Sequence, residues 1–284
     1  EIHAATSVSW QWEKMRETKS VSLNRPAAIA TQTETGESDG IYLPYNYVAQ
    51  MEIDGKPLYV TVSARTHLAF PLGGLQNRMN LGVEWNYQKN LGKGQVFDVT
   101  RPISEGLSTR PRRFKDIPGL QPFAFYAEEV LNLPVKRHKL AFTAGIRLQS
   151  LLGLDRKYEM QGKIYPDLRL DLQWSLPTSN GWNIAFSGGL GWISRMPTTA
   201  QLYPDFKYVD LIQLNYYHNH PDYRRINMMT YKWDNTNYQL EPARNMKWEV
   251  RADIGYKGNR LSATYFRERM NNAFDDLTYY KSLA

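Results

Sequence analysis

The stretch that most constrains the fold of this chain is Trp182 to Trp192. Its even-numbered positions are apolar or glycine, and its odd-numbered positions are small or polar. Strict alternation predicts a β-strand with one apolar face and one small, polar face. A tilted strand of this length places its two terminal indoles about 25 Å apart along a barrel axis, about the height of the lipid-facing band of an outer-membrane barrel. A sandwich strand that carries two tryptophans fits the same pattern, so this strand alone leaves both architectures open.

The same alternation recurs along most of the chain. In one segment, Leu168, Leu170, Leu172 and Trp174 alternate with Asp167, Arg169, Asp171 and Gln173. We expect a strand wherever the pattern appears, with the facing least clear near Glu128 and Glu129, which put one carboxylate on each side. The predicted strands are 5–17, 58–70, 77–89, 121–131, 139–149, 164–175, 182–192, 246–256 and 260–270.

The lengths of these strands and of their connections favour a membrane barrel. Most of the strands are about 10–13 residues long, whereas strands of soluble domains usually have about 5–6. Short connections at 71–76, 132–138, 176–181 and 257–259 alternate with long ones at 90–120, 150–163 and 193–245. Outer-membrane barrels show this rhythm of short periplasmic turns and long extracellular loops. A further long polar segment, 18–57, is expected to contain a small hairpin that turns at Asp54-Gly55.

Composition removes several alternatives. No run approaches the roughly 18 apolar residues of a transmembrane helix, which does not exclude a barrel because alternating strands average out. The chain has no cysteine, which excludes disulfides and cysteine-based metal sites. Its net charge of +7 is spread out. The densest basic run, Arg110 to Lys115, has only Phe114 as an aromatic partner, so we predict no nucleic-acid partner.

Several segments resemble one known family. Ser194 to Pro204 includes Arg195, Pro197, Thr198, Leu202 and Tyr203, and is similar to the Arg-x-Pro-Thr-x-x-x-Leu-Tyr-Pro stretch of TonB-dependent outer-membrane receptors. The likeness is greatest to receptors of the Bacteroidetes, of the SusC-like and siderophore-receptor-like types. It continues at 77–94, 238–249 and 260–274, and covers roughly 58–275. One departure is Glu241-Pro242-Ala243, where the family favours Lys-Pro-Glu.

The resemblance implies the rest of the architecture. Such receptors hold a plug inside a barrel of roughly 22 strands, and TonB pulls on an N-terminal box to open a path for a scarce nutrient. We expect residues 1–284 to be part of one all-β, antiparallel transmembrane β-barrel domain, with about nine or ten of its long strands. The plug domain and the closing strands are expected to lie outside this sequence. The expected location is the bacterial outer membrane.

The long loop 193–245 is the one segment whose residues suggest a ligand-binding site. Aromatic rings beside carboxylates and guanidinium groups suit stacking and hydrogen bonding to a polar ligand such as a glycan. The alternative is that these aromatics pack the loop against itself or against a lipoprotein lid. The candidate ligand-binding residues are Tyr203, Tyr208, Tyr216, Tyr217, Arg224 and Trp233.

Signals for catalysis and cofactors are weak. His218 and His220 would lie on one side of an extended segment, but no third metal ligand accompanies them. Asp167 and Asp171 share a face, as carboxylates do on many lumen walls without chemistry. We therefore predict no enzyme, no catalytic residue, no metal and no cofactor.

The sequence leaves two function classes open. The first is the barrel portion of a transporter that imports a glycan or oligosaccharide, or else a siderophore or cobalamin. Its expected partners are the TonB complex, outer-membrane lipid and a surface lipoprotein lid. The alternative is a secreted or surface all-β binding or adhesion module without transport.

Overall fold

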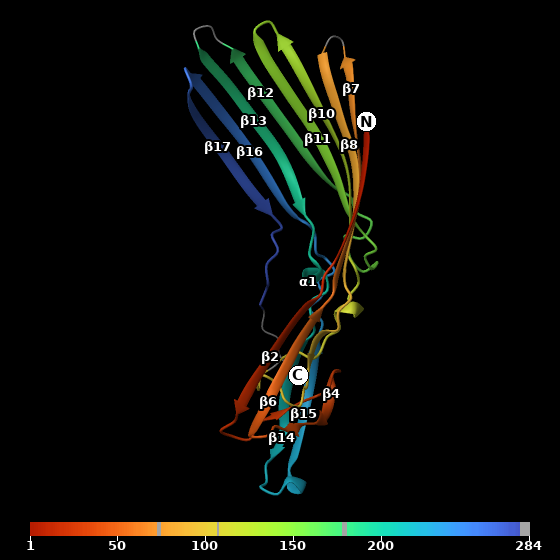
Figure 1. The fold of residues 1–284 in the computed structure, drawn as a ribbon. Coiled ribbons are helices and arrows are strands. Elements are labelled where there is room, and N and C mark those ends of the chain that lie inside the picture. Colours follow the sequence, from red (N-terminus) through yellow and green to blue (C-terminus); the bar gives the residue numbers. More distant parts are fainter. Residues whose placement is uncertain (73–74, 107, 178–180, 279–284) are drawn as a thin grey trace.

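The computed structural model describes residues 1–72, 75–106, 108–177 and 181–278. Its main feature is a nine-stranded antiparallel sheet, here called the wall, in the order β1-β7-β8-β10-β11-β12-β13-β16-β17 (Figure 1). Every strand of the wall pairs with its neighbour in antiparallel register, and β1 and β17 lie at the two edges. The bounds are β1 Ile2–Trp10, β7 Pro57–Leu72, β8 Leu75–Asn90, β10 Gln121–Val135, β11 His138–Leu152, β12 Tyr165–Pro177, β13 Trp182–Arg195, β16 Ala243–Tyr256 and β17 Asn259–Asn271.

The wall confirms the all-β fold class and the predicted strands from residue 57 onward. The register also confirms the two faces, because directly opposed residues point to the same side of a sheet. Leu170 lies opposite Ala144 and Leu190, and Asp171 lies opposite Thr143 and Gly189. The ladder therefore carries apolar side chains across one face, here called the apolar face, and polar side chains across the other, the polar face.

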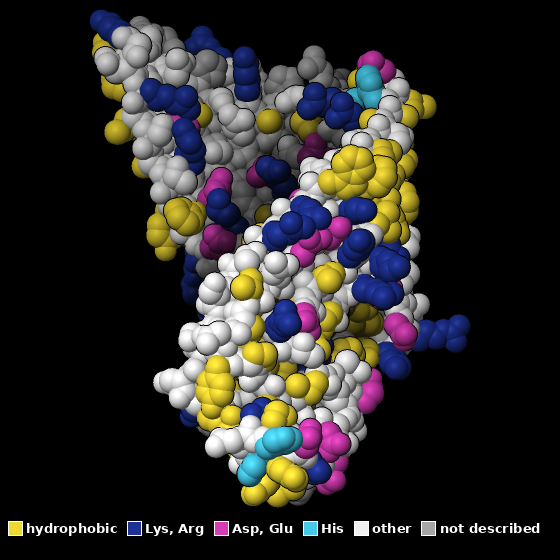
Figure 2. All heavy atoms as spheres, turned by 60° about the horizontal axis from the view of Figure 1, so that its bottom comes forward, with side chains coloured by type: hydrophobic (Ala, Val, Ile, Leu, Met, Phe, Trp, Pro, Cys, Tyr) yellow, Lys and Arg dark blue, Asp and Glu magenta, His cyan; other side chains and the backbone are white. Residues whose placement is uncertain are grey.

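Hydrogen bonds and ion pairs connect neighbouring strands on the polar face. Asn80 donates to Glu128 at 2.8 Å, which places Glu128 on this face and Glu129 on the apolar one. Arg147 reaches Glu84 at 3.4 Å across the intervening strand β10. Charged side chains of both signs are visible in the hollow of the wall in Figure 2.

The predicted single strand 5–17 is divided in the structure. β1 ends at Trp10, and β2 (Glu13–Ser22) begins after two residues outside the ladder. Pro57 lies opposite this break, and a proline has no N–H to donate to a ladder. Only Gln11 N–H donates to the Pro57 carbonyl, at 3.1 Å, so the chain continues in the same direction although the strand does not.

The predicted hairpin at Asp54-Gly55 is wrong. β6 (Asn46–Gly55) leads directly into β7 without reversing, and it pairs with β2 and with β9 (Gly94–Phe97). The ladder shifts by one residue where β8 passes into β9, and at this shift Gly92 lies close to the Asp54 carbonyl. A Cβ at Gly92 would lie 2.1 Å from that oxygen, so only glycine fits there.

The long connections gather at one end of the wall into a second body, here called the extension (Figure 1). They contain short strands and helices rather than irregular chain alone. The segment 18–57 holds β3, β4, β5 and β6; 90–120 holds β9 and η1; 193–245 holds α1, β14, η2 and β15. The remaining bounds are β3 Ala28–Ile29, β4 Gly36–Asp39, β5 Ile41–Tyr42, η1 Phe114–Asp116, α1 Thr199–Leu202, β14 Lys207–Tyr216, η2 Pro221–Tyr223 and β15 Arg225–Trp233.

The short connections lie at the other end of the wall. Lys257 and Gly258 make a tight turn with positive φ, and β7 and β8 remain paired as far as Leu72 and Leu75. The predicted turn residues Gly73-Gly74 and 178–180 lie outside the described residues. Within the described ranges no helix is long and apolar enough to cross a membrane, an observation that bears on helices alone and not on strands.

We expect substitutions on the two faces to differ in their effect on stability. In a bilayer, Leu170→Arg on the apolar face should lower the free energy of unfolding of the intact protein by about 2–4 kcal/mol, because a charge would replace a lipid-facing alkyl group. Asp171→Asn on the polar face should have little effect. Folding titrations in lipid vesicles measure both, and equally small losses would contradict a lipid-facing wall.

Candidate functional site

A small hydrophobic core joins the extension to the wall. Leu202 and Met160 are fully buried in it beside Leu120, Leu151 and Tyr158. The Tyr158 hydroxyl donates to the Leu202 carbonyl at 2.5 Å, and burial raises the pKa of Tyr158. Apolar side chains from distant parts of the chain thus fix where the long loops leave the wall.

The sequence motif at 194–204 supplies one side of this core. Thr198 and Gln201 form a capping box at the start of α1, with Gln201 Oε1 accepting from the Thr198 N–H at 2.8 Å. The cap directs Leu202 into the core and places Tyr203 against Tyr158, with ring centroids 5.8 Å apart. The motif therefore packs where the extension joins the wall, here called the rim. Its Leu202 and Tyr203 side chains are engaged in that packing.

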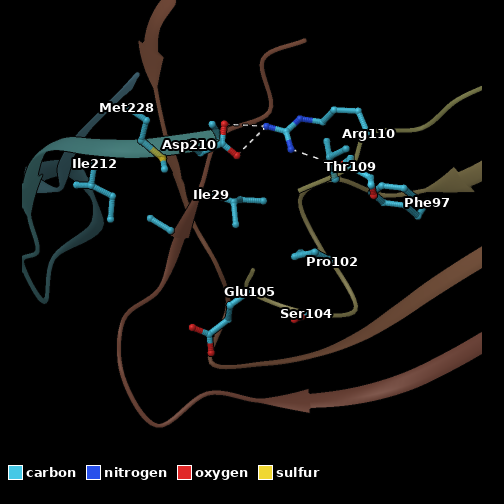
Figure 3. A pocket seen from close by; sticks show the side chains of 13 residues that line it. Ile29, Phe97, Pro102, Ser104, Glu105, Thr109, Arg110, Asp210, Ile212 and Met228 are labelled. Carbon is cyan, nitrogen blue, oxygen red and sulfur yellow. Dashed lines mark hydrogen bonds and ion pairs between the residues drawn. The ribbon is translucent and has the colours of Figure 1, made fainter. Parts of the chain in front are cut away.

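Beyond the rim, three distant segments meet around a pocket of about 140 Å³ (Figure 3). Ile29 from β3 lines one side of the pocket. The loop that carries Glu105 and Arg110 lines the second side, and the β14–β15 hairpin lines the third with Ile212 and Met228. The lining mixes apolar carbons with polar and charged atoms. A pocket of this size can hold several waters or a molecule about as large as benzene.

The ion pair between Arg110 and Asp210 closes this pocket. The guanidinium donates to both carboxylate oxygens, at 2.9 and 3.1 Å, and Arg110 is only 6% exposed. Arg110 Nε also donates to the Gln32 carbonyl, and Thr230 donates to Asp210 at 2.8 Å. The guanidinium lies 4.7 Å from the centre of the Tyr208 ring, whose pKa is raised by burial.

Two arginines of the densest basic run, Arg110 and Arg112, are thus engaged in contacts within the protein. Like Arg110, Arg112 has a carbonyl and a carboxylate partner. It donates to the Tyr203 carbonyl at 3.0 Å and lies 3.8 Å from Asp205. Both arginines tie the loop 90–120 to the loop 193–245. Arg113 and Lys115 remain exposed beside them.

A second cluster forms near the outer tip of the β14–β15 hairpin. The Arg224 guanidinium lies 4.6 Å from the Tyr217 ring centre and 6.0 Å from that of Tyr42, and these two rings meet edge to face at 5.4 Å. Tyr42 donates to Asn215 at 2.5 Å. Burial raises the pKa of Tyr42 despite the nearby guanidinium. The cluster fastens β5 to the hairpin tip.

The β14–β15 hairpin has one packed face and one open face. Ile226, Met228 and Thr230 are buried on the packed face, toward β3 and Arg110. A bulge between Ile212 and Leu214 shifts the register by one residue. Because of this shift, the even-numbered Leu214 and Tyr216 join the odd-numbered side chains before the bulge on the open face. The open face carries Val209, Leu211, Leu214, Tyr216, Met229, Tyr231 and Trp233.

The six predicted binding residues therefore separate into three groups. Tyr203 packs against the core at the rim and Tyr208 packs beside Arg110, so neither is open, and Tyr217 and Arg224 form the tip cluster. Tyr216 and Trp233 lie on the open face, where Tyr216 is 53% exposed. The sequence analysis did not identify Tyr42, Tyr45 or Arg110 as partners of this loop, and only the alternation of Val209 and Leu211 hinted at an open apolar face.

The weaker sequence candidates have local partners. His218 Nδ1 accepts from the His220 N–H at 3.0 Å, and among the described residues no group of three metal-ligating side chains occurs. Asp167 accepts from both the N–H and the hydroxyl of Ser194, and Asp171 accepts from Arg169 at 2.7 Å. Asp167 thus connects β12 to the end of β13, whereas Asp171 pairs within its own strand.

The comparison with protein families agrees with this architecture. The family model of the TonB dependent receptor-like β-barrel matches residues 5–282, so the chain belongs to the family of TonB-dependent receptors and supplies β-barrel structure. No curated protein matches the chain. Receptors of this family are outer-membrane transporters that act with TonB, and in such a barrel we expect the apolar face of the wall to face the membrane.

The buried ion pair predicts a local stability effect. Arg110→Ala leaves Asp210 uncompensated inside the extension, and breaking such a pair costs about 3–5 kcal/mol. We expect the amides of β14 and β15 to lose hydrogen-exchange protection accordingly, while the amides of the wall keep theirs. Arg113→Ala, an exposed arginine of the same run, is the matched control and should change neither. Equal protection in both variants would contradict the assigned role of Arg110.

Proposed function

We propose that this chain forms part of the wall and the outward-facing extension of a TonB-dependent transporter, and that the open face of the β14–β15 hairpin contacts the incoming nutrient or a lid that covers it. The observation that carries the proposal is a sheet face on which Leu211, Leu214 and Tyr216 are exposed in the described part of the chain, at the end of the wall where the long connections gather. A saccharide is our first candidate for the nutrient, and a siderophore or cobalamin the second.

The orientation follows from the connections. Outer-membrane barrels place short turns in the periplasm and long loops outside. The tight turn at Lys257-Gly258 then lies on the periplasmic side, and the extension lies where a solute arrives first. The exposed ring of Tyr216 offers a flat surface for stacking on a sugar ring.

The preference for a saccharide and for a lipoprotein lid rests on the likeness to receptors of the Bacteroidetes, which often pair with a glycan-binding surface lipoprotein. The remaining proposed partners are the TonB complex and outer-membrane lipid. Membership of the receptor family favours transport over the alternative of a secreted binding or adhesion module.

Substitutions on the open face test the proposal. Tyr216→Ala and Trp233→Ala in the intact receptor should weaken uptake or lipoprotein association several-fold, because they remove contact surface. Tyr217 is unsuitable for this purpose because its ring also supports the tip cluster. Uptake assays with candidate oligosaccharides and co-purification of surface lipoproteins provide the two readouts.

The control is Tyr223→Ala, an exposed tyrosine of η2 that lies outside the paired strands of the hairpin. Barrel assembly, followed by surface labelling and protease resistance, should be normal in all three variants. If uptake and partner binding both stay unchanged, the open face has no part in capture and specificity resides elsewhere in the receptor.

A further inference from the structure

An apolar groove of about 530 Å³ runs over the membrane-facing side of β12, β13, β16 and β17, which lie side by side in Figure 1. Its volume falls within the range of roughly 300–1,000 Å³ found for small-molecule sites. Its walls and floor include Trp174, Phe186, Gly188, Ala252, Ala263 and Tyr265.

The groove arises from the order of large and small side chains across the ladder. Trp174, Phe186, Ala252 and Ala263 occupy one cross-strand row, with two large residues followed by two small ones. In the adjacent row, Gly188 is the small residue. A Cβ placed on Gly188 would lie 3.6 Å from its nearest neighbour, so a methyl group would fit there in ordinary contact and the glycine leaves that space unfilled.

Aromatic side chains border the groove on two sides. The rings of Trp174 and Phe186 lie 5.8 Å apart and form one border. Tyr265 packs against Trp248 at 5.5 Å and forms the other. Arg251, whose backbone lies beneath the groove, directs its guanidinium to Asp253 on the polar face, so its charge does not enter.

We propose that this groove binds one acyl chain of an outer-membrane lipid. The groove is continuous with the membrane-facing surface of the wall, so lipid reaches it directly. Its lining side chains are apolar, which suits a hydrocarbon chain. The proposal rests on the family assignment, and it does not depend on which nutrient is transported.

The shape favours a lipid chain over a second protein. Small residues such as Gly188 and Ala252 support protein contacts in membranes when two backbones can approach closely. Here the aromatic borders stand above the small floor and keep a second backbone away. A single hydrocarbon chain is narrow enough to lie between them and contacts the ring faces on both sides.

The test uses the intact receptor in vesicles that contain a phospholipid with a photoreactive diazirine in its acyl chain. After illumination, mass spectrometry locates the labelled peptides. We expect labelling to concentrate on the peptides that contain 186–188, 250–252 and 263–265. Ala252→Leu, which fills the groove, should reduce this labelling at least three-fold.

The matched control is Ala64→Leu, the same change on the same face of β7, which lies beside the other edge strand. It should leave labelling of the groove unchanged. If Ala252→Leu fails to assemble, Ala263→Leu fills the groove from β17 and replaces it. Even labelling of the whole apolar face, no loss on filling, or cross-linking of the groove to a co-purified protein would each overturn the proposal. Uptake is a separate readout, so failure here leaves the proposed capture role untouched.

Discussion

The structure depends on the backbone register of the nine-stranded wall. A shift of one residue between any two strands would move every side chain of one strand to the opposite face. Apolar residues would then face the polar interior, and charged residues would face lipid. The ladder from Leu140 to Ile254 keeps the two sets apart, and the ion pairs on the polar face, such as Arg147 with Glu84, add contacts that only the observed register permits.

The passage from wall to extension relies on local breaks in that ladder. Pro57 removes one donor opposite Gln11, and Gly92 allows the backbone to approach Asp54. These two positions interrupt the sheet without reversing the chain. Three strands of the wall can therefore continue outward as β2, β6 and β9, and the core around Leu202 holds the remaining loops against the rim.

The extension is stabilised mainly by contacts between residues far apart in the sequence. Arg110 and Asp210 are separated by 100 positions, and Tyr42 and Asn215 by 173. Each pair joins a different long connection to the β14–β15 hairpin. The hairpin thereby has one face covered by the rest of the extension, and on the other face Leu211, Leu214 and Tyr216 are exposed in the described part of the chain.

The sequence by itself determined the wall. Alternation with a period of two is a local property, and it identified the strands from 58 to 270, their faces and the end at which the long connections lie. It could not reveal the divided strand at Gln11 or the straight passage at Gly55, because the cause of each lies on a neighbouring strand.

The tertiary structure decided the candidate site. The sequence offered six aromatic or basic residues of the loop 193–245 equally as binding candidates. In the folded chain Tyr208 is buried, whereas Tyr216 is exposed. The physical reason is that a bulge reverses the facing of everything after it, and that Tyr217 and Arg224, besides contacting each other, contact Tyr45 and Tyr42 from a segment more than 170 residues away. Side-chain chemistry names what a residue can bind, whereas the register and the partners decide whether it is free to do so.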